Sequence, residues 1–199
     1  MTKLLLLTIL PLLSADDAST KLLGRWRSLE TSKGGIGAMF EFRKDGVVDY
    51  SPGAVVEMKY RIEGDQLVLP PATINGPELK ETMEWPGKDK LRLKASGGPW
   101  VELTRAGPAP DVKNPILGEW TSSREMAGKT MEVRYLFYSA GKGLLLIPFL
   151  KQSGSYSIRG ESIHFELPGR DPMEGKFKVD GDMLVIPGPN TGESRFARY

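Results

Sequence analysis

The sequence predicts an all-β protein made of two tandem small up-and-down antiparallel β-barrels of about eight short strands each. Three observations support this prediction. Apolar residues recur with a period of two rather than 3.6. The 23 glycines and 15 prolines among 199 residues are spread along the chain as turn residues. A short Leu-Gly-x-Trp signature occurs twice. We expect such meanders to curl into barrels, because closure removes their open edges.

Individual strands follow from the alternation. In residues 56–63 every second residue is apolar and its neighbours are charged, and residues 162–167 alternate in the same way. One face of each strand is therefore buried and the other is wet, as in antiparallel sheets. Glycine-containing turns should connect neighbouring strands as hairpins; they lie at Asp45-Gly46, Glu63-Gly64-Asp65, Arg159-Gly160-Glu161 and Asp180-Gly181-Asp182.

The second half of the chain repeats landmarks of the first half in the same order and at a nearly constant offset. Such agreement is hard to obtain by chance, so we interpret it as a duplication. The matched pairs are 23–26 with 117–120, 40–46 with 135–141, 60–67 with 156–163, and 103–105 with 196–198.

The duplication sets the expected domain boundaries. We expect one barrel over 21–106 and a second over 115–199, with a short leader at 16–20. Residues 107–114 and the residues that flank them are rich in proline, which disfavours both helix and ladder pairing. This stretch is therefore expected to be a semi-rigid linker between the two barrels.

The N-terminus predicts export. A basic start, Met1-Thr2-Lys3, precedes an apolar run that is too short to span a bilayer but fits a signal-peptide core. We expect residues 1–15 to be a signal peptide cleaved after Ala15, which places the product in the periplasm or outside the cell. A membrane-anchoring N-terminus is the alternative. After cleavage no stable membrane insertion is expected.

Charge and composition narrow the partners. Removing residues 1–15 takes away one lysine and leaves 26 basic and 25 acidic residues. The mature chain is thus nearly neutral and has no basic run, which argues against nucleic acid as a partner. With no cysteine in the chain, disulfides, thiol catalysis and thiolate metal sites are excluded.

A Gly-x-Trp on a first strand, a long antiparallel meander and an arginine on the last strand resemble the lipocalin-like domains of the calycin group. The resemblance implies that the tryptophan closes one barrel end and that the late arginine stacks over its face. Each half has roughly 85 residues, so its strands are short and its interior is filled by side chains rather than hollowed into a deep cup. The residues that carry the resemblance are Gly24, Trp26 and Arg105 in the first half, and Gly118, Trp120 and Arg198 in the second.

Two places are candidates for ligand contact. Glu81 shares a strand face with Leu79, Met83 and Trp85, so its carboxylate should be turned partly inward or lie at the rim. Trp85 and Trp100 have no aromatic equivalents in the second half, and they either line a small pocket or plug the barrel end.

The run 144–150 is continuously apolar, and we expect it to be buried against the first domain or to form a partner or ligand site. Leu146 and Phe149 are its candidate contact residues.

No pattern in the sequence indicates a reaction. His164 is the sole histidine and lies on the polar side of its strand, with no partners at metal-ligand spacing. No Gly-x-Ser-x-Gly elbow and no complete phosphate loop are present. We therefore expect no catalytic residue, no metal and no cofactor, and a binding or protein-interaction module of the cell envelope with a small-molecule or protein partner. A carrier of a small hydrophobic molecule is the first alternative, and an enzyme that uses Glu81 or a tyrosine is the second.

Overall fold

The computed structural model of the chain describes residues 15–71, 75–108, 113–126, 128–188 and 192–199. Within these ranges most residues are in strands, and every strand pair with a defined register is antiparallel. The prediction of an all-β antiparallel protein is confirmed.

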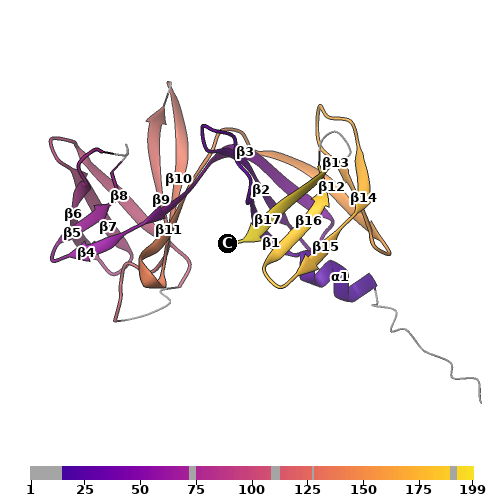
Figure 1. Cartoon of the computed structure of the whole chain (residues 1–199), viewed down its shortest axis with the longest axis horizontal. Coiled ribbons are helices and arrows are strands. Elements are labelled where there is room, and N and C mark those ends of the chain that lie inside the picture. Colours follow the sequence, from indigo (N-terminus) through magenta and orange to yellow (C-terminus); the bar gives the residue numbers. More distant parts are fainter. Residues whose placement is uncertain (1–14, 72–74, 109–112, 127, 189–191) are drawn as a thin grey trace, which may run out of the picture. The chain divides into compact units, whose positions relative to one another are not determined.

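One short helix, α1 (Ala15–Leu22), precedes the strands (Figure 1). The described part of the first sequence half contains β1 (Gly24–Ser28), β2 (Ile36–Phe42), β3 (Val47–Lys59), β4 (Arg61–Glu63), β5 (Gln66–Leu69), β6 (Leu79–Gly87), β7 (Lys90–Ala95) and β8 (Trp100–Ala106). The second half contains β9 (Gly118–Met126), β10 (Lys129–Tyr138), the 3-10 turn η1 (Ser139–Gly141), β11 (Lys142–Pro148), β12 (Gln152–Arg159), β13 (Ser162–Glu166), β14 (Met173–Lys176), β15 (Lys178–Asp180), β16 (Met183–Pro187) and β17 (Glu193–Arg198).

The chain forms two compact units that do not coincide with the two expected domains. Unit 1 contains residues 1–29, 40–50 and 152–199, and unit 2 contains residues 30–39 and 51–151. Each unit therefore combines strands from both sequence halves. The domain boundaries 21–106 and 115–199 do not describe this arrangement, since neither half keeps its strands together.

The long strand β3 explains why the halves are mixed. It runs for 13 residues without a turn, and residues 51–53 (Ser-Pro-Gly) continue it instead of ending it. Its first part pairs with β12, with Val47 opposite Ser155, and this pairing lies in unit 1. Its second part pairs with β11, with Gly53 opposite Pro148, and this pairing lies in unit 2. The chain thus passes from one unit to the other within a single strand (Figure 1).

Within unit 2, consecutive strands pair as hairpins from β4 through to β11, and β11 then pairs with β3. β3 and β4 are separated only by Tyr60. The core of this unit is formed by large apolar side chains from almost every strand; its buried members are Leu67, Met83, Leu91, Leu93, Leu103, Ile116, Trp120, Val133, Tyr135 and Phe137.

Within unit 1, β1 lies between β2 and β17, and the pairing continues from β17 to β16 and from β16 to β15. On the other side, β12 lies between β3 and β13, and β13 also pairs with β14. The core of this unit is aromatic. The ring of Phe40 lies 5.7 Å from Phe42, 6.1 Å from Phe165 and 5.2 Å from Phe196, measured between ring centres. Such clusters add about 0.5–1.5 kcal/mol per pair to the burial of each ring.

Local predictions held where the structure describes them. Gly46, Gly64, Gly160 and Gly181 all have positive φ at the expected hairpin turns. The leader expected at 16–20 is part of helix α1. Residues 1–14, which hold most of the expected signal peptide, lie outside the described residues, as do 109–112 of the expected linker. The segment 107–114 joins β8 to β9, which pair with each other inside unit 2, so it does not connect two units. No helix in the described ranges is long and apolar enough to cross a membrane.

Candidate functional site

Two tryptophans are fully buried in equivalent surroundings, one in each unit. The indole N–H of Trp26 and that of Trp120 each donate to a backbone carbonyl oxygen four residues earlier, at 2.7 Å in both cases. The guanidinium carbon of Arg198 lies 4.1 Å from the ring centre of Trp26, and that of Arg105 lies 4.1 Å from the ring centre of Trp120. A cation over an indole contributes about 0.5–2 kcal/mol, depending on its exposure.

Each arginine also ties down the segment that leads into the tryptophan strand. Arg198 donates to the carbonyl oxygens of Lys21 and Leu23, at 2.6 and 2.5 Å. Arg105 donates to those of Pro115 and Leu117, at 2.5 and 2.7 Å. In both arginines the two Nη atoms are thus engaged with backbone carbonyls, so these residues hold the fold.

The pairing of arginine with tryptophan corrects the expected one. The resemblance implied that Arg105 covers Trp26 and that Arg198 covers Trp120, each within its own sequence half. The structure exchanges them because β1 pairs with β17 and β8 pairs with β9, which places Trp26 opposite Arg198 and Trp120 opposite Arg105. The glycine of the signature has a clear role: Gly24 has φ +110°, and a Cβ there would lie 2.7 Å from Nη1 of Arg198.

Four polar residues, Glu81, Ser122, Arg124 and Tyr135, face the inside of unit 2, and we call this group the polar end of unit 2. Ser122 and Arg124 lie two and four residues after Trp120 on β9, on the same strand face as the buried tryptophan. Nη2 of Arg124 donates to the hydroxyl of Tyr135 at 2.5 Å.

Glu81 is inward because of its register. It lies opposite the buried Leu67 on β5 and two residues before the buried Met83 on its own strand, β6. The prediction that Glu81 turns partly inward is consistent with this placement. Burial raises the pKa of the Glu81 carboxyl, and the positive charge of Arg124 offsets part of that rise. Burial likewise raises the pKa of the Tyr135 hydroxyl, opposed by Arg124 and reinforced by Glu81.

The other predicted contact residues do not join Glu81. The ring of Trp85 lies edge-on to Trp120, with 5.8 Å between centres, and Trp85 is 40% exposed. Trp100 pairs with Lys94 on the charged face of β7 and β8, where Lys94 and Arg92 lie over its ring, so it does not line the inside of the unit.

The apolar run 144–150 is only partly buried: Leu144 and Leu146 are buried, residues 145, 147 and 148 are half-buried, and the last two residues are exposed. Leu146 is 0% exposed and lies opposite Val55, so its side chain is closed to a ligand. Phe149, just beyond the end of β11, is 48% exposed. Leu145 and Ile147 pack against the core of unit 2, so the run contributes to the fold, and its last two residues are exposed.

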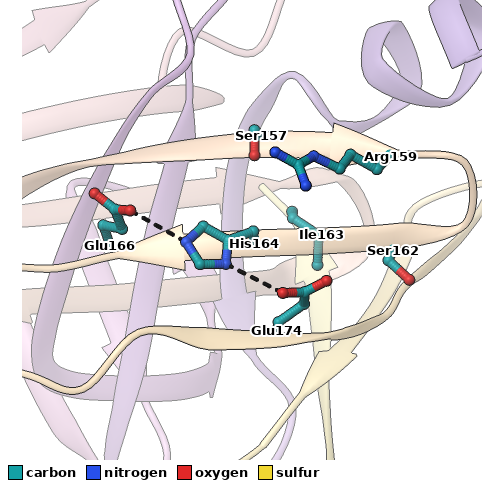
Figure 2. A pocket seen from close by; sticks show the side chains of 7 residues that line it. All are labelled: Ser157, Arg159, Ser162, Ile163, His164, Glu166 and Glu174. Atoms are coloured by element: carbon teal, nitrogen blue, oxygen red, sulfur yellow. Dashed lines mark hydrogen bonds and ion pairs between the residues drawn. The ribbon is translucent and has the colours of Figure 1, made fainter.

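A shallow polar hollow of about 230 Å³ lies on the outer face of β12, β13 and β14 in unit 1 (Figure 2). His164 is at its centre, with Nε2 3.2 Å from Glu166 and Nδ1 3.5 Å from Glu174. The two carboxylates thus lie at opposite nitrogens of the ring, so one metal ion cannot contact all three side chains. The sequence placed His164 on a polar strand face, and the structure agrees.

No set of three or more His, Asp or Glu side chains in the described ranges is arranged to hold a metal ion. Comparisons with protein-family models, curated proteins and solved structures find no match to the chain. What the chain binds therefore has to be argued from its own residues.

Sequence reasoning found Glu81 but missed Arg124 and Tyr135. A signal for both was present. Arg124 follows Trp120 by four residues on one strand, so it shares the inward face if the strand continues that far. Tyr135 occupies the position that Phe40 has in the first half, and a hydroxyl there marks a polar substitution in an apolar place.

Proposed function

We propose that the chain is an exported, non-catalytic binding module whose small-molecule or protein partner contacts the polar end of unit 2. One observation carries this proposal: Arg124 and Tyr135 contact each other on the inward side of unit 2, beside an apolar core. Glu81 is close enough for its carboxylate to interact electrostatically with Arg124. Buried charge is costly to keep, and it recurs at binding sites because a partner compensates it.

We also propose that each unit is a small closed β-barrel of the lipocalin-like kind. The support is the order of pairing. In unit 2 the pairs lead from β4 strand by strand to β11 and then to β3, which continues into β4 after Tyr60. The Trp–Arg stacks at the ends of β9 and β1 are the second support.

A deep carrier cup is disfavoured by the packing. Leu91, Leu93, Leu103 and Phe137 are at most 1% exposed inside unit 2, so large side chains fill the space that a lipid would need. An enzyme would require a nucleophile with a base beside it. Ser122 is buried, and the next residue on the same face of its strand is Arg124. An arginine cannot act as the base for a serine nucleophile as a histidine or a carboxylate can, which favours binding over catalysis.

Export is proposed from the basic start and apolar run of residues 1–13. Expression of the full chain in a bacterial host, followed by intact mass measurement of the exported product, tests it. The expected mass corresponds to a chain that begins at Asp16. A product that retains residues 1–15 would refute cleavage after Ala15.

Native mass spectrometry of the purified full chain tests the binding function. We expect a co-purifying small molecule or chain that is lost from Arg124→Met and kept by Arg61→Met. Arg61 is a suitable control because it is an exposed arginine of unit 2 that contacts Glu63 and Glu78. A bare chain in every preparation, or equal retention by both variants, would contradict the proposal.

A further inference from the structure

Two polar atoms at the polar end of unit 2 are buried and have no hydrogen-bond partner among the described residues. They are Oγ of Ser122, a residue only 7% exposed, and Nε of Arg124. Both side chains belong to the inward face of β9 and are two residues apart. An unpaired buried polar atom destabilises a fold, and such atoms are rare in native proteins.

The groups that converge here are hydrogen-bond donors. Nε–H of Arg124 and the hydroxyl of Ser122 are both available to donate. The hydroxyl of Tyr135 accepts from Arg124, which leaves its own O–H able to donate to a further acceptor. Two hydroxyl donors beside a guanidinium complement an oxyanion, and a carboxylate accepts from arginine in a favourable charge-assisted geometry.

The packing beneath these donors limits the size of the ligand. Leu67, Met83, Leu93 and Val133 are at most 6% exposed and belong to the same core as Tyr135. A long alkyl chain therefore has no room below the donors. The acid group of a ligand would meet Arg124, while the rest of a small ligand stays outside the packed core.

The first sequence half repeats only the serine of this group: Ser28, two residues after Trp26, is 7% exposed, like Ser122. Phe40 stands where unit 2 has Tyr135, and Glu30, four residues after Trp26, stands where it has Arg124. Leu67 of unit 2 corresponds to Ile163 of unit 1. The residue opposite Leu67 is Glu81, whereas the residue opposite Ile163 is Gly175. Arg124 and Tyr135 are therefore particular to the repeat that contains Trp120, whereas the buried serine belongs to the shared strand pattern.

We infer that the polar end of unit 2 binds the carboxylate of a small organic acid, with Arg124, Ser122 and Tyr135 as the donors. This inference rests on the proposed binding function and names its ligand class. Glu81 borders the same space and disfavours ligands with a second negative charge.

Titration of the full-length, isotope-labelled chain tests this inference by amide chemical shifts. The probes are benzoate, benzyl alcohol and benzylamine, which share a ring and differ in the polar group. We expect benzoate to shift the amides of β9 and β10 near Ser122 and Tyr135, and to bind about tenfold or more tightly than benzyl alcohol. Arg124→Met should abolish this preference, and Arg61→Met should keep it. Ser122→Ala, the gentler change, should weaken benzoate several-fold without changing the spectrum elsewhere.

The outcomes separate this inference from the binding function. Equal binding of benzoate and benzyl alcohol, unchanged in Arg124→Met, would overturn the carboxylate assignment and leave a binding site for apolar molecules. Tighter binding of benzylamine would assign recognition to Glu81 and also overturn it. Binding of none of the three probes at this end would overturn it as well, while the co-purification experiment would still decide the binding function by itself.

Discussion

The exchange of arginines between the two sequence halves can be tested by a double-mutant cycle. The substitutions are Trp26→Leu and Arg198→Met, alone and together. Leucine keeps a large apolar side chain but has no ring face, and methionine keeps an apolar stem but has no charge. A second cycle combines Trp26→Leu with Arg105→Met, the arginine of the same sequence half.

The expected coupling follows from the geometry. The Arg198 guanidinium carbon lies 4.1 Å from the Trp26 ring centre, within the range of a strong cation–π contact. The hydrogen bonds of Arg198 go to backbone carbonyls and should persist in Trp26→Leu. The coupling free energy of the cycle therefore reports only the stacking of Arg198 on Trp26. We expect a coupling of about 1–2 kcal/mol, since the Arg198 side chain is 32% exposed and is partly screened. Arg105 contacts Trp120 instead, so its coupling to Trp26 should be within about 0.5 kcal/mol of zero.

Urea unfolding followed by far-ultraviolet circular dichroism measures these couplings, because the substitutions remove part of the tryptophan fluorescence. Arg105→Met alone should destabilise more than Arg198→Met, because the Arg105 side chain is only 2% exposed, whereas that of Arg198 is 32% exposed and its contacts are weakened by solvent. A coupling of Trp26 to Arg105 rather than to Arg198 would show that each half keeps its own arginine, and the exchange would be wrong.

Two further predictions concern unit 2. Gly53→Ala should lower the free energy of unfolding by about 2 kcal/mol or more in urea titrations, because a Cβ there would overlap the carbonyl oxygen of Ile147. Gly87 has open space around it, so the control Gly87→Ala should change the free energy of unfolding by less than about 0.5 kcal/mol. Burial raises the pKa of folded Glu81 above its unfolded value despite Arg124, so the folded state holds a proton that the unfolded state has released. The free energy of unfolding should therefore fall as pH rises from the ordinary glutamate range through the folded pKa of Glu81. Glu81→Gln should lack this dependence on pH. Equal slopes of unfolding free energy against pH in both proteins, measured over about pH 4–8, would contradict the raised pKa of Glu81.

The strands were predictable because their signals are local. Alternation in 56–63 and 162–167 and the glycine turns at Gly64, Gly160 and Gly181 depend only on neighbours in sequence, and the structure has strands and turns at these places. The glycine and the buried tryptophan of each Leu-Gly-x-Trp signature were equally predictable from the sequence. A burial pattern identifies which face of a strand is inside, but it does not say inside which unit.

The polar end of unit 2 was predictable only in part. Glu81 stood out because a carboxylate shared a strand face with Leu79, Met83 and Trp85. Arg124 and Tyr135 did not, since their meeting depends on how far β9 and β10 extend and on a side chain that reaches along the sheet. Trp100 was misplaced for the opposite reason: an aromatic residue suggests an interior, yet two cations cover this one on the charged face.

Local signals cannot distinguish the exchanged arrangement from the expected one, because equivalent strands of the two halves carry the same local pattern and can take each other's place in a pairing. What decides between them is the conformation of residues 51–53. A turn there would return the chain to its own half, whereas a straight strand carries it into the other unit. Proline in a strand loses one ladder bond, and Gly53 admits the backbone of Ile147 so closely that a side chain is excluded. These two residues are commonly interpreted as turn formers, but here they allow β3 to pair with β12 before them and with β11 after them. The connectivity of the two units therefore depends on a segment whose composition predicts the opposite conformation.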